Sequence, residues 1–190
     1  MESIYSPEKQ SLVLGGGCFW CLEAVYQSWD GVLSVTPGYG GGTLARPTYE
    51  QVCGGETGHG EVVQVVFDPA RLPLDLVLDI FFAAHDPTTL NRQGCDLGSQ
   101  YRSLILFGDR AQEEAARAAI ARHQPDWPDP IVTQVGPLDR FWPAEADHWD
   151  YYRRHGGAPY CQGVIGPKLA GLRAAFAGHP RLLPEGDGDD

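Results

Sequence analysis

The stretch SLVLGGGCFWCLEAVYQSW, residues 11–29, joins a β-rich run, three consecutive glycines and an apolar segment. The run SLVL has the composition of a short strand. Beyond the glycines, large apolar residues recur at steps of three and four: Phe19, Leu22, Tyr26 and Trp29. This spacing is typical of an amphipathic helix. The stretch therefore predicts a strand, a tight turn and a helix that ends before Gly31.

Further elements follow on the C-terminal side of this unit. They are expected as strands at 32–39, 61–69, 103–107 and 131–135, and as helices at 72–87 and 108–124. The second of these helices has Asp109 as its expected cap. The first six elements run β-α-β-β-α-β, and the aromatic- and glycine-rich segment 140–168 is expected to wrap the sheet before a last helix near Pro167. The predicted fold class is α+β: a ferredoxin-like (split βαβ) two-layer sandwich with added elements and a long C-terminal coil.

Length and composition favour one catalytic domain. We expect it at 11–180, after an N-terminal extension at 1–10 and before an acidic, disordered tail at 181–190. No apolar run approaches the ~20 residues of a membrane helix, so no membrane association is expected. The net charge of −11 disfavours nucleic-acid binding. Five cysteines, an odd count, and an N-terminus without a signal-peptide pattern predict a reduced, cytoplasmic protein, which we expect to be a monomer.

Cys18 is the first candidate for chemistry, because it is expected where a strand turns into a helix. Free N–H groups and the positive end of the helix dipole favour thiolate there, so we expect a pKa below the usual ~8.5. The preceding glycines allow the sharp turn and leave the sulfur approachable. Cys53 and Cys95 lack this context and are expected to be buried as small hydrophobes.

The pair formed by Cys18 and Cys21 allows three interpretations: a redox dithiol, half of a metal site, or one reactive cysteine beneath aromatic rings. A structural zinc site requires four ligands, and the chain has no second closely spaced pair of ligands, so no metal is expected. A thioredoxin-like dithiol remains possible at a helix start. It gives no role to Phe19 and Trp20, which lie between the two thiols in the sequence.

Two other clusters supply polar groups. Glu61 opens an expected strand after the glycine-rich sequence GETGHG, where loss of water contact raises the pKa of a carboxyl and keeps it a proton donor. His59 is expected to be structural. Three further side chains are candidates for orienting a polar oxygen: Tyr49, Asp96 and Tyr101. From spacing alone, however, a solvated surface charge is the expected role of Glu61, and the buried acid is the alternative. Ordinary core roles are the alternative for the other three groups.

Six motifs in order resemble one known family. They are GGGCFW (15–20), PTYEQVC (47–53), TGHGEVVQVVFDP (57–69), HDPTT (85–89), RQGCDLGSQYRS (92–103) and PYCQGVIGPKL (159–169). Together they closely resemble the A-type peptide methionine sulfoxide reductases, over residues 11 to 176. The resemblance implies a ferredoxin-like fold and reduction of the S epimer of methionine sulfoxide, free or in proteins, without a cofactor. Repair of oxidised proteins is the implied cellular role.

The resemblance also assigns roles to residues. It implies that Cys18 is the nucleophile, that Phe19 and Trp20 form the pocket for the substrate methyl group, and that Glu61 is the acid. The groups that orient the sulfoxide oxygen are matched by Tyr49, Asp96 and Tyr101. The implied products are methionine and a sulfenic acid on Cys18, which condenses with a second thiol to a disulfide that thioredoxin reduces.

The second thiol is Cys161 or Cys21, or both act in a relay. Cys161 is preferred because glycines flank it and because members of the family share its YCQ sequence, whereas a pair within one helix is expected to be strained. Many members carry glycine where this chain has Cys21, and AEADHWDYY (144–152) also departs from the usual pattern. A thiol peroxidase or dithiol exchanger, and a redox-sensing protein, are the alternative functions.

Overall fold

Within residues 9–185, six strands form one mixed β-sheet in the order β7-β6-β1-β3-β2-β8. The structure is a computed structural model that describes these residues. Residues 1–8 and 186–190, in the expected extension and tail, lie outside the described range. The strands of the sheet are β1 (Gln10–Gly15), β2 (Val32–Gly40), β3 (Gly60–Phe67), β6 (Leu104–Phe107), β7 (Gln134–Pro137) and β8 (Trp142–Pro143). A separate small hairpin is formed by β4 (Arg92–Gln93) and β5 (Asp96–Leu97).

Strand β1 lies in the middle of the sheet, between β3 and β6, and is antiparallel to both. Leu14 faces Val63 on one side and Ile105 on the other. Strand β2 pairs with β3 and β8, again antiparallel, and the β6–β7 pair is parallel. The strand that leads into the glycine turn is therefore fixed on both edges by backbone hydrogen bonds.

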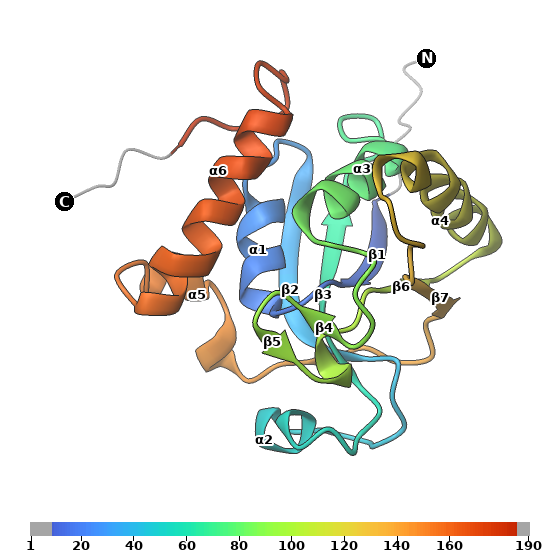
Figure 1. Ribbon diagram of the computed structural model, residues 1–190, viewed down its shortest axis with the longest axis vertical. Coiled ribbons are helices and arrows are strands. Elements are labelled where there is room, and N and C mark those ends of the chain that lie inside the picture. The colour runs from blue at the N-terminus through green and yellow to red at the C-terminus, as the bar shows by residue number, and fades with distance from the viewer. Residues whose placement is uncertain (1–8, 186–190) are drawn as a thin grey trace, which may run out of the picture.

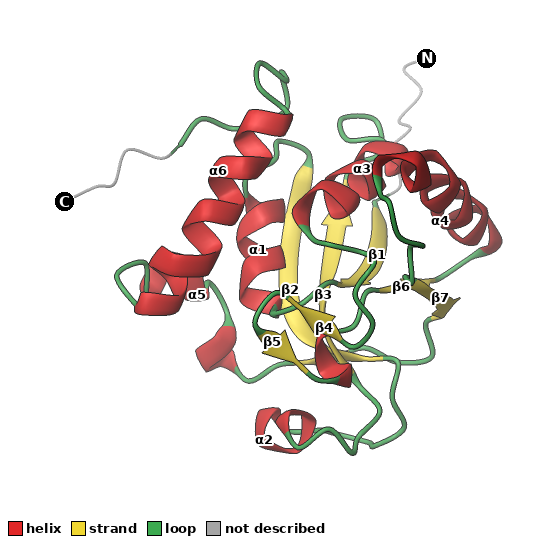
Figure 2. Ribbon diagram, viewed as in Figure 1, coloured by secondary structure: helices red, strands yellow, loops and turns green. Residues whose placement is uncertain are grey.

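The four longest helices, at residues 19–27, 74–84, 110–123 and 166–175, cover one face of the sheet (Figures 1 and 2). Leu12 and Leu14 belong to the core beneath these helices, whereas Val13 belongs to a smaller cluster with Leu138 and Phe141. This alternation is the one a strand requires. The helices are α1 (Phe19–Gln27), α2 (Tyr49–Cys53), α3 (Leu74–Ala84), α4 (Arg110–His123), α5 (Tyr151–Arg154) and α6 (Gly166–Ala175). None of the helices described is long and apolar enough to cross a membrane.

Most elements occur where the sequence predicts them. The side chain of Asp109 accepts a hydrogen bond from Gln112 N at 2.8 Å, which confirms it as the cap of α4. The strand expected at 131–135 was placed too early, since β7 begins at Gln134. Helix α2 was missed inside the glycine-rich loop. Thr48 and Gln51 form a capping box there, and this T-x-x-Q pattern is visible in the sequence.

Ordered structure continues past the boundary expected at residue 180. Leu182 forms a β-bridge with Trp29, and Leu183 N donates to the carbonyl of Ser28 at 2.8 Å. Arg181 pairs with Asp30 at 2.8 Å. Residues 181–183 therefore pack on the C-terminal end of α1 rather than belonging to the tail.

The turn after β1 depends on its glycines. Gly17 has a φ of +94°, and a Cβ there would lie 2.7 Å from Cγ of Gln93. A Cβ on Gly16 would lie 3.0 Å from the ring of His85. The ring of His85 is held between the carbonyl of Phe81 at 2.6 Å and the hydroxyl of Ser103 at 2.7 Å, so it cannot easily move away.

Gly17→Ala is expected to lower the free energy of unfolding by about 1–3 kcal/mol, because alanine is strained at this φ and contacts Gln93. Gly171→Ala is the matched control. Gly171 lies inside α6 with open space around it, so alanine there should raise stability by about 0.5–1 kcal/mol. Urea unfolding followed by circular dichroism measures both. Equal effects of the two substitutions would contradict this account of the turn.

Candidate active site

Cys18 occupies the N-cap position of α1, as the sequence predicts, and its side chain is only 7% exposed. The prediction that its pKa is lowered was wrong in sign. Burial raises the pKa of the Cys18 thiol, and a hydrogen bond to Cys21 and the charge of Glu61 act in the same direction. The helix start does contribute as expected through the backbone N–H of Trp20, which favours thiolate, but loss of water contact outweighs it.

Cys21 is the hydrogen-bonding partner of Cys18. The hydrogen bond from Cys18 lowers the pKa of Cys21 to about 7, against the effect of its own burial and with help from the positive charge of Lys168. Its sulfur also lies 3.7 Å from the hydroxyl of Tyr160, which donates to Asp96 Oδ2 at 2.7 Å. A hydrogen-bonded chain thus runs from Cys18 through Cys21 and Tyr160 to Asp96.

Glu61 is on β3, next to the turn, and is 1% exposed. Its Oε1 accepts a hydrogen bond from the backbone N–H of Phe19 at 3.2 Å, and its buried Oε2 has no partner among the described residues. Burial raises the pKa of Glu61 to about 8, and the negative charges of Asp96 and Cys21 add to the shift. Glu61 is thus not the surface charge that its spacing favours, and its raised pKa keeps it a neutral carboxylic acid at pH 7.

Aromatic rings enclose the turn. Phe19 is fully buried and stacks on Tyr49 with ring centroids 6.2 Å apart. Trp20 stacks on Tyr151 at 3.7 Å with the two planes only 6° apart. The indole N–H of Trp20 donates to Nδ1 of His148 at 3.2 Å, and His148 also packs on Tyr49 at 4.4 Å. The result is a cluster of packed rings from α1, α2 and the C-terminal segment, which we call the aromatic box.

Two carboxylates that the sequence analysis did not select hold this box together. Glu145 accepts from the hydroxyl of Tyr39 at 3.0 Å and from the backbone N–H of Tyr49 at 3.1 Å. Glu23 is 1% exposed and accepts from the backbone N–H groups of Asp150 and Tyr151 at 3.1 and 3.2 Å. Glu23 is a charged residue on the apolar face of α1. A charge at such a position is the sequence pattern that could have identified Glu23 as a buried, functional carboxylate.

Asp96 and Tyr101 also reach the site. Tyr101 is half-buried in a 3₁₀ turn, η1 (Ser99–Tyr101), and burial raises its pKa together with the negative charges of Glu61 and Asp96. Asp96, on β5, is held by Tyr160. The structure therefore groups both residues with Glu61. Tyr160 and His148 are the additional residues that sequence reasoning missed, although Tyr160 directly precedes the selected Cys161.

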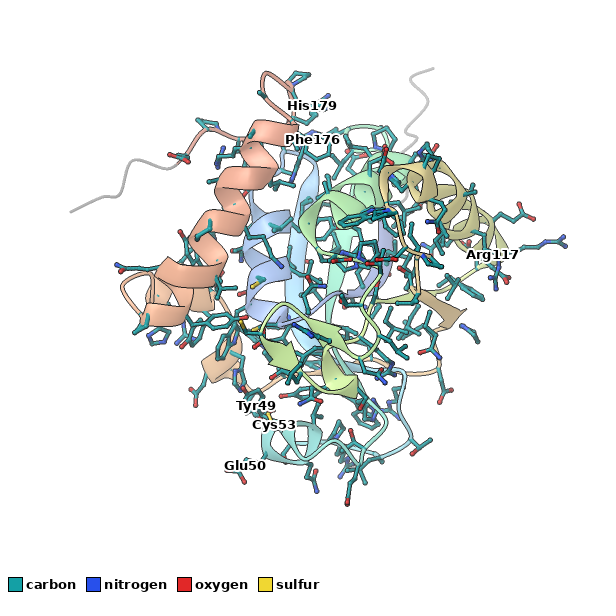
Figure 3. All side chains as sticks on the ribbon, viewed as in Figure 1. Tyr49, Glu50, Cys53, Arg117, Phe176 and His179 are labelled. Carbon is teal, nitrogen blue, oxygen red and sulfur yellow. The ribbon has the colours of Figure 1, made fainter. Side chains whose placement is uncertain are left out.

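The other cysteines divide into two groups. Cys161 is fully buried at the start of a π-helical turn, η4 (Cys161–Ile165), which packs against α1. Cys53 and Cys95 are exposed, which corrects the expectation that both are buried. In the view of Figure 3, Tyr49 and Cys53 lie on the side of α2 nearer to the rest of the molecule, and Glu50 lies on the opposite side. A hydrogen bond links Tyr49 and Cys53.

His59 is structural, as expected. Its Nδ1 accepts from the N–H of Gly42 at 3.0 Å, and its Nε2 pairs with the carbonyl of Leu44 at 2.7 Å. The imidazole thereby fixes the glycine-rich loop. His59 does not contribute a group to the cluster around Cys18.

The combination of these groups defines a class of enzyme site. The site contains a buried thiol at a helix start, a neutral carboxylic acid beside it, an aromatic box and two further buried thiols. These are the elements of a thiol-dependent oxidoreductase. Among residues 9–185, no three His, Cys, Asp or Glu side chains gather as metal ligands would.

Comparison with known proteins gives the family. A model described as "Peptide methionine sulfoxide reductase" matches residues 10–179. Proteins named peptide methionine sulfoxide reductase MsrA are 51% identical in Granulibacter bethesdensis, over 90% of this chain and 94% of that protein, and 52% identical in Thermus thermophilus, over 86% and 93%. The chain belongs to the A-type peptide methionine sulfoxide reductase family.

Solved structures agree with this assignment. Methionine sulfoxide reductase A of Corynebacterium diphtheriae superposes with a TM-score of 0.76 at 32% identity, covering 80% of this chain and 77% of that one. Reduced Mxr1 from Saccharomyces cerevisiae gives 0.77 at 33% identity, covering 80% and 89%. Mxr1 in complex with Trx2 gives 0.55 at 25% identity, covering 75% and 84%.

The raised pKa of Glu61 predicts a pH dependence of stability. The folded protein keeps this proton up to about pH 8, whereas the unfolded chain releases it near 4.5. The contribution of Glu61 to stability is therefore complete below pH 4.5 and is lost as the pH rises through about 8. Glu61→Gln, which mimics the neutral acid, should lack this loss.

Urea unfolding of both proteins between about pH 5 and 9 measures the difference. Groups such as His85, whose pKa burial lowers to about 4, titrate in both proteins and cancel in the comparison. A free-energy difference between the two proteins that does not change with pH would contradict the buried, neutral Glu61.

Proposed function

We propose that this protein reduces methionine sulfoxide, free or within proteins, to methionine at the expense of thiols. One observation carries the proposal: the acid form of Glu61 is held against the N-terminus of α1 beside Cys18, with one oxygen left free. Membership of the A-type family supports it. Repair of oxidised proteins is the corresponding role in the cell.

The proposed chemistry uses both groups. A sulfoxide resists attack at sulfur because its oxygen is a poor leaving group, so Glu61 delivers a proton to that oxygen while Cys18 attacks the sulfur. The attack forms a transient bond between the Cys18 sulfur and the substrate sulfur, and the S–O bond breaks as its oxygen leaves as water with the protons of Glu61 and Cys18. A water molecule then attacks the Cys18 sulfur and the S–S bond breaks, which releases methionine, leaves a sulfenic acid on Cys18 and returns the proton to Glu61. Two electrons thereby pass from the Cys18 sulfur to the substrate. The free Oε2 of Glu61 provides the position for this proton transfer.

The aromatic box is the proposed subsite for the substrate methyl group. Phe19 and Trp20 supply apolar walls, and the face of the indole stabilises positive charge that develops on the S–CH₃ group, by about 1 kcal/mol. The polar groups of Tyr49, Asp96 and Tyr101 are proposed to orient the sulfoxide oxygen towards Glu61. Separate subsites for methyl and oxygen make the site selective for the S epimer.

Recycling is proposed to proceed through a disulfide. Cys161 is buried against α1 and is our preferred second thiol, with Cys21 as the alternative or as an intermediate. Thioredoxin is the proposed reductant, and the complex of yeast Mxr1 with Trx2 supports this choice. Every step uses cysteine sulfur and the Glu61 proton, so the reaction requires no cofactor.

Three finer descriptions, of the fold, the location and the oligomeric state, are also proposals. The strand order β6-β1-β3-β2, with antiparallel pairing throughout and helices α1 and α3 as connections, supports a ferredoxin-like (split βαβ) core. Five free cysteines suit a reducing cytoplasm. The exposed large apolar residues are spread over several segments, which supports a monomer.

The function is tested with racemic methionine sulfoxide and dithiothreitol. A reductase of the proposed kind forms methionine and stops when half of the racemate has been consumed, whereas a dithiol exchanger or redox sensor forms none. Cys18→Ser should form no methionine, because it lacks the nucleophile. Cys95→Ser, which removes an exposed thiol, should behave as the wild type. Turnover by Cys18→Ser is the result that excludes the proposed nucleophile.

Glu61→Gln should reduce the rate of methionine formation about 100-fold, the usual contribution of one positioned acid. The wild-type rate should also decline as the pH rises through about 8, where Glu61 loses its proton. The variant should lack this decline. Single-turnover formation of methionine at several pH values measures both effects. A near wild-type rate in Glu61→Gln at neutral pH would show that Glu61 is not the proton donor.

A further inference from the structure

The hairpin formed by β4 and β5 carries Asp96 but lies outside the main sheet (Figure 1). Each of its strands has only two residues, and a lone two-stranded hairpin is at best marginally stable. Asp96 nevertheless has to stand at a fixed place beside Cys18 if it is to orient the sulfoxide oxygen. The hairpin therefore needs an attachment near the turn that carries Cys18.

Gln93, the last residue of β4, makes an attachment of this kind. Its Oε1 accepts a hydrogen bond from the backbone N–H of Asp86 at 3.0 Å, and its Nε2 donates to the carbonyl of the same residue at 2.9 Å. Asp86 is fixed in turn, because its Oδ1 accepts from the N–H and the hydroxyl of Thr88 at 2.9 and 2.6 Å. The side-chain amide of Gln93 thus ties the hairpin to the segment that follows α3 by both backbone groups of one residue.

The same side chain lies against the glycine turn. A Cβ on Gly17 would be 2.7 Å from Cγ of Gln93 and 2.9 Å from its Cβ, so the aliphatic part of Gln93 fills the space that a side chain would take. One residue earlier, the ring of His85 fills the corresponding space at Gly16. The two residues that precede Cys18 are therefore held by side chains of the same two segments that the Gln93 amide joins.

Gln93 and Asp96 are paired directly across the hairpin. Side chains of such a pair lie on the same face, with Cβ atoms about 5 Å apart. Only two residues connect the strands, and the first of them, Gly94, has a φ of +57°, so the connection is a tight turn. On this face Asp96 accepts the hydroxyl of Tyr160 at 2.7 Å. A displacement of Gln93 is therefore passed on to Asp96 over a short and stiff path.

We propose that Gln93 is a positioning residue for the reduction, which sets the place of Asp96 relative to the turn that carries Cys18. This inference rests on the proposed function and adds the residue that aligns two parts of its site. Gln93 acts through Asp96 and not on the substrate itself. The effect on the rate is large because a reacting group about 1 Å out of place lowers a rate by as much as about 100-fold.

Gln93→Met keeps the aliphatic contact with Gly17 and loses both hydrogen bonds to Asp86. Its single-turnover rate of methionine formation from methionine (S)-sulfoxide should be about tenfold below that of the wild type. The substrate concentration that gives half of the maximal rate should change by less than about threefold, because the aromatic box is intact. Gln93→Asn, whose amide is too short to reach both groups of Asp86, should give the same result and serves if the first variant fails to fold. Wild-type rates overturn the proposal.

Gln112 offers a matched control. Its Oε1 accepts from the backbone N–H of Gly108 and its Nε2 donates to the carbonyl of Ser11, both at 2.8 Å, at the opposite end of β1 from the glycine turn. Gln112→Met should lower the urea midpoint to an extent similar to Gln93→Met and keep the single-turnover rate within about twofold of the wild type. Equal losses of rate in the two variants would assign the effect of Gln93 to stability alone and overturn the proposal.

A double-mutant cycle tests whether Gln93 acts through Asp96. In an Asp96→Ala background, Gln93→Met should change the single-turnover rate by less than about twofold, because the group that it positions is gone. A further tenfold loss in this background, which is the result for independent effects, overturns the proposal. No methionine from the wild type overturns the proposed function instead.

Hydrogen exchange followed by mass spectrometry shows the attachment directly. Backbone amides of residues 91–98 should exchange faster in Gln93→Met than in the wild type, and at the wild-type rate in Gln112→Met. Amides of β1 should remain protected in Gln93→Met. A hairpin that exchanges in Gln93→Met as it does in the wild type overturns the proposed role of Gln93.

Discussion

Exclusion of water from the junction of β1 and α1 is the constraint on which this site depends. In water, Glu61 would be ionised at neutral pH and would have no proton to give. The fold prevents this by placing Glu61 on β3, the neighbour of β1, where the backbone N–H of Phe19 holds it and the core surrounds it. The same dry environment disfavours a free charge on Cys18, so its proton is shared with Cys21.

The C-terminal segment completes that exclusion. Strands β1 and β3 alone would leave the turn open, because the rings of His148 and Tyr151 that close the box come from residues more than a hundred positions later in the chain. Glu23 and Glu145 hold this segment by accepting hydrogen bonds from it and from its neighbours. The site is thus formed by the sheet and by the C-terminal segment that carries His148 and Tyr151, which we call the cover. Carboxylates hold the cover in place.

The local parts of this design could be predicted from sequence, and the parts made by distant contacts could not. The strand, the turn and the start of α1 follow from short patterns, whereas the proton on Glu61 depends on burial by the surrounding core. The sign of the Cys18 pKa shift was missed because burial by distant segments outweighs the local helix end. Cys53 was misjudged because the short helix α2, which was not predicted, leaves it exposed, and the Tyr160 bridge was not visible because Asp96 lies 64 residues away from it.

The attachment of the cover by Glu23 has a consequence for how the molecule opens. The cover is joined to α1 by a few hydrogen bonds that all involve side chains, among them the two from backbone N–H groups to the Glu23 carboxylate, whereas β1 is paired along both edges by its backbone. Cooperative units with so few connections open at a lower free energy than the sheet they rest on. Amide hydrogens around residue 150 should thus exchange with solvent long before those of β1 and β3, and the buried thiols become accessible in a protein whose sheet is still folded.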